Sequence, residues 1–73
     1  MMNIKLGKYK HYKGFICEVI GIARHTETLE EMVIYKHDSS DYGKDSLWAR
    51  PAAMFAETVK INGEDVPRFT FVG

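Results

Sequence analysis

Short apolar runs separated by turn residues are the feature that most constrains the fold of this chain. The clearest example is the segment 58–71, "TVKINGEDVPRFTF", in which Asn62 and Gly63 interrupt alternating apolar residues. An Asn-Gly pair in this setting is typical of a two-residue hairpin turn, because both residues tolerate positive φ angles. Pro67 has no backbone N–H, so it confines the last strand to a sheet edge or occupies that strand's first positions.

Turn residues divide the rest of the chain in the same way. Gly14 is predicted to lie in a turn, and Gly21 inside an apolar run predicts a bulge. The polar stretch 37–46 is predicted to be a loop, and Pro51 is suited to begin one short helical turn over residues 51–56. Strands are therefore expected over residues 8–12, 15–23, 29–36, 47–50, 58–61 and 64–72.

The expected fold class is mainly β. Five or six short strands with one short helical turn near residues 51–56 resemble a small, strongly bent, SH3-like barrel that is partly open. A chain of 73 residues has room for one hydrophobic core, which predicts a single domain over residues 1–73. This similarity is one of fold, and a fold of this kind does not define a function.

Composition indicates a protein of the reducing cytoplasm. Cys17 is the one cysteine in the sequence, so no intramolecular disulfide can form. The most apolar run is the ten-residue segment 14–23, which contains Glu18. A membrane-spanning helix needs about 20 apolar residues, so we expect no membrane association.

The charges are unevenly distributed along the chain. Residues 1–26 carry five basic side chains against one acidic, whereas residues 27–73 carry five basic against nine acidic. The basic N-terminal part suggests an anionic partner. Lysines on a solvated strand edge also prevent edge-to-edge aggregation, which is the alternative explanation for the same pattern.

Several blocks of the sequence resemble one protein family. "GKYKHYKG", "ARHTET", "LWARPAAMF" and "VPRF", in this order, are similar to short bacterial proteins known only as a domain of unknown function. The similarity extends from Gly7 to Phe69. It implies no activity and no cofactor, because none is assigned to the family. Cys17 replaces an aromatic residue that is common at its position, and the loop at residues 44–46 is slightly longer.

The residues suited to metal binding or catalysis form no motif. His11, His25, His37 and Cys17 lack the spacing of a metal site, so neither a metal nor another cofactor is predicted. In an extended chain His25 and Glu27 share a face, where a base and its orienting group can meet. A small-ligand or catalytic site built around Arg24, His25 and Glu27 is therefore the alternative to a purely structural turn.

Basic and aromatic residues favour a binding function over an enzymatic one. Aromatic rings stack with bases while cations contact phosphates, a combination that suits single-stranded nucleic acid. Tyrosine and tryptophan are equally favoured where a protein segment is recognised, so that partner stays open. We therefore expect a non-enzymatic binding module. The candidate binding residues are Lys8, Tyr9, Lys10, Tyr12, Arg24, His25, Glu27, Tyr42, Trp48 and Arg50. We expect Tyr42 to be exposed, because it lies beside Gly43 in the polar stretch, and Cys17 to be buried, because it lies in an apolar strand.

Overall fold

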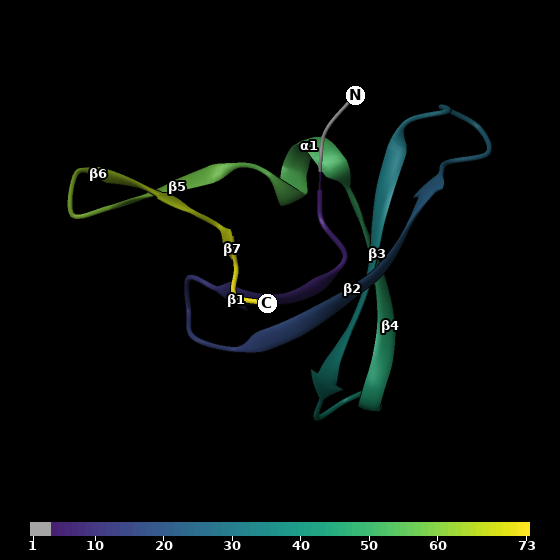
Figure 1. Cartoon of the computed structure of the whole chain (residues 1–73), viewed down its shortest axis with the longest axis horizontal. Helices are drawn as coiled ribbons and strands as arrows, with labels where there is room; N and C mark the ends of the chain where they lie inside the picture. Colours follow the sequence, from purple (N-terminus) through teal and green to yellow (C-terminus); the bar gives the residue numbers. More distant parts are fainter. Residues whose placement is uncertain (1–3) are drawn as a thin grey trace.

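Seven strands and one short helix make up the computed structural model, which describes residues 4–73 (Figure 1). The predicted mainly β class and the single short helix are thus confirmed for this part of the chain. The elements in order are β1 (Gly7–His11), β2 (Ile16–Arg24), β3 (Glu31–Ser39), β4 (Gly43–Pro51), α1 (Ala52–Phe55), β5 (Thr58–Ile61), β6 (Glu64–Pro67) and β7 (Phe69–Phe71).

The strands form two antiparallel sheets. Five of them pair in the order β4-β3-β2-β1-β7, and β5 pairs with β6 in a separate hairpin. Figure 1 shows the larger sheet strongly bent along β2 and β3, with the β5–β6 hairpin extending to one side. The edges of the larger sheet, β4 and β7, do not pair with each other, so the barrel is not closed.

The structure has seven strands and not the expected five or six, because the last predicted strand is divided into β6 and β7. The chain bends at Arg68, so that β6 stays with β5 while β7 pairs with β1. The Arg68 N–H donates to the Glu57 carbonyl at 3.0 Å, and the Arg68 carbonyl accepts from the Tyr12 N–H at 3.0 Å. These two bonds satisfy the backbone between the sheets, where a continuous strand was predicted.

The predicted loop over residues 37–46 is mostly strand. β3 continues to Ser39 and β4 begins at Gly43, and His37 pairs with Ser46 across them. The Ser46 hydroxyl also donates to the His37 carbonyl at 2.9 Å. Polar side chains are compatible with a strand where its backbone hydrogen-bonds to a neighbouring strand and its side chains face solvent. The polar composition of this segment therefore led to the wrong prediction of a loop.

Turn positions predicted from the sequence are confirmed. Asn62 and Gly63 have φ angles of 51° and 82°, as a two-residue hairpin of this type requires. The register of β2 against β3 shifts between Val19 and Gly21, which is the expected bulge. Pro51 precedes α1 at its N-cap position, with a φ of −52° that suits proline.

The core lies on the inner face of the bent sheet, under α1. Alternation along the strands turns the buried side chains to this face, and Val33 and Val19 are almost fully buried there. Phe55 from the helix stacks on Phe69 of β7, with ring centres 4.2 Å apart and planes 6° apart. The helix follows the last residue of β4, so the opposite end of the inner face, toward Ser46, has no helix over it. The buried apolar residues are Tyr9, Cys17, Val19, Val33, Tyr35, Ala52, Phe55 and Phe69.

A candidate aromatic binding surface

A row of rings crosses the sheet at the end of the inner face that lies away from α1. His11 stacks on Phe15 at 4.4 Å between ring centres, and Phe15 stacks on His37 at 5.0 Å. His37 stacks in turn on Trp48 at 5.5 Å, and Tyr42 meets the edge of Trp48 at 5.5 Å. These five residues, here called the aromatic row, come from β1, the β1–β2 turn, β3, β4 and the β3–β4 turn.

Backbone pairing and side-chain hydrogen bonds position the row. The His11 N–H donates to the Phe15 carbonyl at 2.8 Å and closes the β1–β2 turn, which places both rings on one side. Trp48 Nε1 donates to Ser46 Oγ at 3.0 Å, and His37 Nδ1 lies 2.8 Å from the Asp38 carbonyl. Both indole and imidazole are therefore held in one orientation, which reduces the entropy lost when a ligand binds.

The rings of the row differ in exposure. His11 is buried, Trp48 and His37 are half-buried, and Tyr42 is 73% exposed, as predicted for this tyrosine. Phe15 is 40% exposed although it is a large apolar side chain. An exposed phenylalanine within a contiguous aromatic group is typical of a recognition surface, because solvent contact with such a ring is unfavourable.

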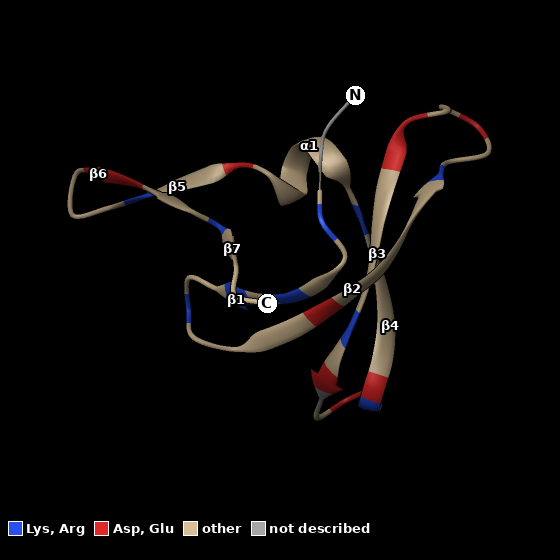
Figure 2. Ribbon diagram, in the orientation of Figure 1, with Lys and Arg blue, Asp and Glu red and all other residues tan. Residues whose placement is uncertain are grey.

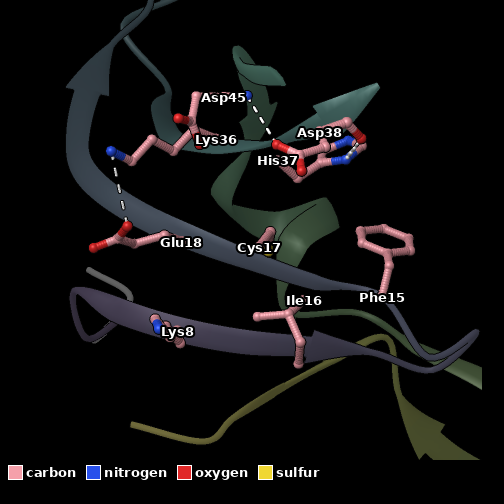
Figure 3. Close-up of a pocket in the computed structure, with 9 residues that line it drawn as sticks. All are labelled: Lys8, Phe15, Ile16, Cys17, Glu18, Lys36, His37, Asp38 and Asp45. Carbon is pink, nitrogen blue, oxygen red and sulfur yellow. Dashed lines mark hydrogen bonds and ion pairs between the residues drawn. The ribbon is translucent and has the colours of Figure 1, made fainter. Parts of the chain in front are cut away.

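An open pocket of about 430 Å³ adjoins the row (Figure 3). Phe15 and His37 lie at one end of this pocket and Lys8 and Glu18 at the other, with Ile16 between them. The pairing of β2 with β3 ends at Glu18 and Lys36, so the pocket lies where these strands diverge. The residues that line it are Lys8, Phe15, Ile16, Cys17, Glu18, Lys36, His37, Asp38 and Asp45.

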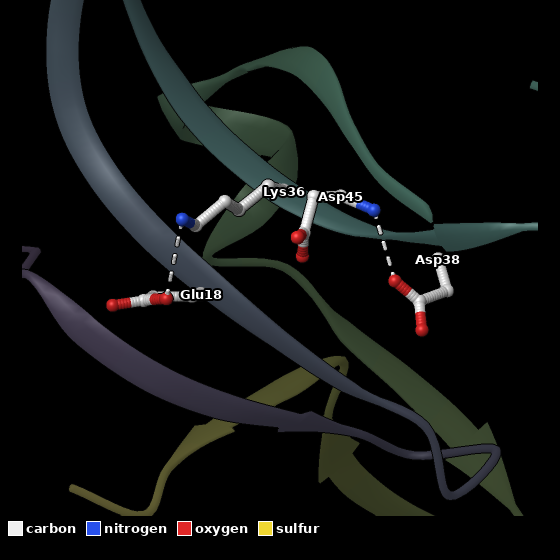
Figure 4. Close-up of polar contacts among 4 residues, drawn as sticks. All are labelled: Glu18, Lys36, Asp38 and Asp45. Atoms are coloured by element: carbon white, nitrogen blue, oxygen red, sulfur yellow. Dashed lines mark hydrogen bonds and ion pairs between the residues drawn. The ribbon is translucent and has the colours of Figure 1, made fainter. Parts of the chain in front are cut away.

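The charged side chains that line this pocket are nearly balanced, with two basic and three acidic, and two of them form an ion pair (Figure 4). Lys36 Nζ lies 3.8 Å from Glu18 Oε1, and Asp38 Oδ1 accepts from the Asp45 N–H at 2.9 Å. The Lys36–Glu18 pair is partly exposed and contributes at most about 1 kcal/mol. The pocket therefore has no strong net field of its own, and its aromatic end is the part suited to a ligand.

The "RHTET" segment forms a turn whose polar groups bind one another. His25 Nδ1 accepts the backbone N–H groups of Glu27 at 3.1 Å and Thr28 at 3.3 Å. The Arg24 guanidinium donates to the Leu29 carbonyl at 2.6 Å. The Glu27 carboxylate accepts from the Thr26 hydroxyl, and no hydrogen bond joins it to the His25 ring among the contacts found in residues 4–73. The segment is thus built as a hydrogen-bonded connection between β2 and β3.

The N-terminal candidates separate by strand alternation. Lys8 and Lys10 are exposed on the outer face, whereas Tyr9 is buried in the core on the inner one. The Tyr9 hydroxyl donates to the Lys5 carbonyl at 2.8 Å, so this ring is not presented to a ligand. Tyr12 is half-buried at the end of the aromatic row, 4.5 Å from the His11 ring. Lys10 therefore lies away from the aromatic row, whereas Lys8 lines the far end of the pocket that adjoins it.

The C-terminal candidates are brought together more closely. Trp48 and Tyr42 join the aromatic row, and half-buried Arg50 places Cζ 5.7 Å from the ring centre of Phe69. Phe15 and His37 were not predicted as binding residues, although they connect the row across the sheet. His37 follows buried Tyr35 by two positions on one strand, and that alternation was a usable signal for a shared face.

Three buried groups have shifted pKa values, and the first is Tyr9, whose pKa is raised by burial. Burial, followed by the positive charges of Arg68 and Arg50, lowers the pKa of His11. Burial raises the pKa of the Cys17 thiol to about 11, an effect that the nearby Arg50 charge partly offsets. Cys17 is only 2% exposed, which confirms the predicted burial of this residue. A thiol with such a pKa is almost entirely protonated at neutral pH and is a poor nucleophile.

Within residues 4–73, no three His, Cys, Asp or Glu side chains are grouped so as to hold a metal ion. The same part of the chain contains no helix with the length and apolar character that crossing a membrane requires.

The fold and the surface define a small, mainly β protein with an aromatic row beside an open pocket. The chain belongs to the DUF1653 family, whose model matches residues 7–71 and is described as a protein of unknown function. It is similar to the crystal structure of a DUF1653 protein from Bordetella bronchiseptica, with 34% identity and a TM-score of 0.83 over 97% of this chain and 90% of that one. None of the curated proteins matches the chain. Membership confirms the resemblance predicted from the sequence blocks.

Proposed function

We propose that this protein is a non-enzymatic binding module that recognises single-stranded nucleic acid through the aromatic row. The observation that carries the proposal is the stack of His11, Phe15, His37 and Trp48, continued by exposed Tyr42. Exposed rings held in fixed orientations offer faces and edges on which bases stack, and each such contact contributes about 1–3 kcal/mol.

Charges near the row favour one end of it for the phosphates of a bound nucleic acid. Half-buried Arg50 and exposed Lys13 lie near its His11 end, where both contribute to the low pKa of His11. Asp38, Asp41 and Asp45 lie around the β3–β4 turn, near its Tyr42 end. Phosphates would therefore bind at the His11 end, because the acidic turn repels them.

A bacterial cytoplasmic setting agrees with this proposal. Cys17 is free and buried, as in proteins that stay reduced. The alternative site around Arg24, His25 and Glu27 receives no part in the proposal, since the hydrogen-bonding groups of that turn contact one another.

The test is a fluorescence titration of a labelled single-stranded oligonucleotide at several salt concentrations. Phe15→Ala and Tyr42→Ala should each weaken binding by about 1–3 kcal/mol, with the dependence on salt unchanged. Ile61→Ala is the matched control, because Ile61 is 41% exposed and lies in β5, outside both the aromatic row and the lining of the pocket. That variant should change affinity by no more than about twofold. Absence of binding at low salt would rule out nucleic acid as the partner.

A protein segment is the second candidate partner, favoured by the free edge of β4. This strand has nine residues and lies at one end of the five-stranded sheet. An extended peptide can add to such an edge through backbone hydrogen bonds. The test is to select binding peptides from a library of extended heptapeptides and to measure amide hydrogen exchange with a selected peptide bound. Exchange should slow along β4. Slower exchange only in other strands would contradict peptide binding at this edge.

A further inference from the structure

Two arginines beside the aromatic row lack polar partners. Arg50 and Arg68 are half-buried, and the Nε atom of each is buried without a hydrogen-bond acceptor. Neither guanidinium takes part in the ion pairs found within residues 4–73, which are Lys36–Glu18 and Lys60–Asp65. Buried polar groups in native proteins normally have partners, so an unpartnered pair at one place requires an explanation.

Both arginines lie near His11, the strand partner of Phe69. Arg50 reaches from β4 to within 5.7 Å of the Phe69 ring centre, and the Arg68 charge acts on His11 as the Arg50 charge does. His11 is the strand partner of Phe69, and their ring centres lie 4.9 Å apart. The two edges of the open sheet thus converge on one cationic site at the buried end of the aromatic row.

Among residues 4–73, no carboxylate forms an ion pair with either arginine. All the charged groups that affect His11 are basic: Arg68, Arg50, Lys13 and His37. Figure 2 shows that acidic residues are placed mainly toward the ends of the hairpins. The nearest strand neighbours of His11 and Phe69, on β1 and β7, carry lysine and threonine. An anion that entered the site beside the His11 ring would therefore meet mainly cationic and aromatic groups.

We propose that Arg50 and Arg68 together bind a phosphate group. A guanidinium presents a planar fork of N–H donors that matches two oxygens of a phosphate, and two such forks neutralise its charge. The phosphate would supply the acceptor that both buried Nε–H groups lack. The inference rests on the proposed function, because that function supplies the phosphate. This phosphate belongs to the backbone or the terminus of the nucleic acid whose bases stack on the aromatic row.

The first experiment uses inorganic phosphate and sulfate, with no nucleic acid present. In nuclear magnetic resonance titrations, the Nε–H signals of Arg50 and Arg68 and the ring signals of His11 should shift together and saturate. Sulfate does not titrate near neutral pH, and its binding should raise the pKa of His11 by neutralising the two guanidiniums. Shifts that do not saturate, or that leave the His11 ring unchanged, would overturn the proposal.

Variants that remove one positive charge distinguish binding at this site from nonspecific attraction of anions to the protein. Arg68→Met keeps an apolar stem and should weaken sulfate binding about tenfold or more, whereas Arg68→Lys should restore part of it. Lys10→Met removes the same charge from the outer face and should leave binding within about twofold. Equal losses in Arg68→Met and Lys10→Met would show nonspecific attraction and refute the site.

The oligonucleotide titration then distinguishes the two proposals. Arg68→Met should lower affinity and flatten the slope of log affinity against log salt by about 0.7 for one lost phosphate contact. An oligonucleotide that binds Arg68→Met as it binds the wild type would refute the phosphate site and leave stacking intact. Saturable binding of phosphate without binding of oligonucleotide would support the site and refute nucleic acid as the partner.

Discussion

Phe55 is the residue whose removal should most weaken the fold around the candidate site. It is 3% exposed and comes from α1, the only helix within residues 4–73. Its ring stacks on Phe69 at 4.2 Å and meets the edge of Tyr9 at 5.2 Å. Phe55→Ala would therefore empty the space between the helix and the inner face of the sheet.

The expected loss is large for a chain of this size. Replacing a buried phenylalanine by alanine costs about 3–5 kcal/mol, which includes the cavity left behind. A domain of 73 residues has a total free energy of unfolding of about 4–11 kcal/mol. The substitution should thus remove between about a quarter and all of the stability, and Phe55→Leu should remove clearly less because it keeps most of the volume.

Urea unfolding followed by Trp48 fluorescence measures this loss. Met54→Ala is the matched control, since Met54 lies on the same helix and is 46% exposed. It should change the free energy of unfolding by less than about 0.5 kcal/mol. A loss below about 1 kcal/mol for Phe55→Ala would refute the conclusion that α1 covers the core, since even partial cavity formation exceeds that value.

Three further predictions concern the cysteine and two histidines. Cys17 should react slowly with a thiol reagent in the native state and rapidly in denaturant, because burial raises its pKa to about 11; rapid native labelling would contradict this. Since the pKa of His11 is lowered by folding, the unfolded chain takes up its proton first, and stability should fall as pH drops below about 6.5. His11→Asn should lose that component of the pH dependence, which chemical denaturation at several pH values can measure. His25→Ala should cost about 1 kcal/mol by removing the acceptor of two backbone N–H groups, and His25→Asn, which keeps an acceptor, should recover most of it in urea unfolding.

Parts of the candidate site could be predicted from residue type alone. Exposure of Tyr42 followed from its place beside a glycine in a polar segment, and the low accessibility of Cys17 followed from its apolar strand. Tyr9 was assigned to a binding surface because tyrosine is common there, yet the structure places it in the core. Residue type cannot decide between these positions, since a tyrosine ring is apolar enough for burial and polar enough for a surface.

Features that depend on neighbours in the chain were determined by the sequence itself. The Asn62–Gly63 turn, the bulge before Gly21 and the helical turn after Pro51 follow from φ preferences and side-chain alternation over a few residues. Only the tertiary structure divided the last strand at Arg68 and brought Arg50 of β4 to the Phe69 ring of β7. The aromatic row likewise needs the register of four strands, and register depends on which faces pack together, a property that no local pattern encodes.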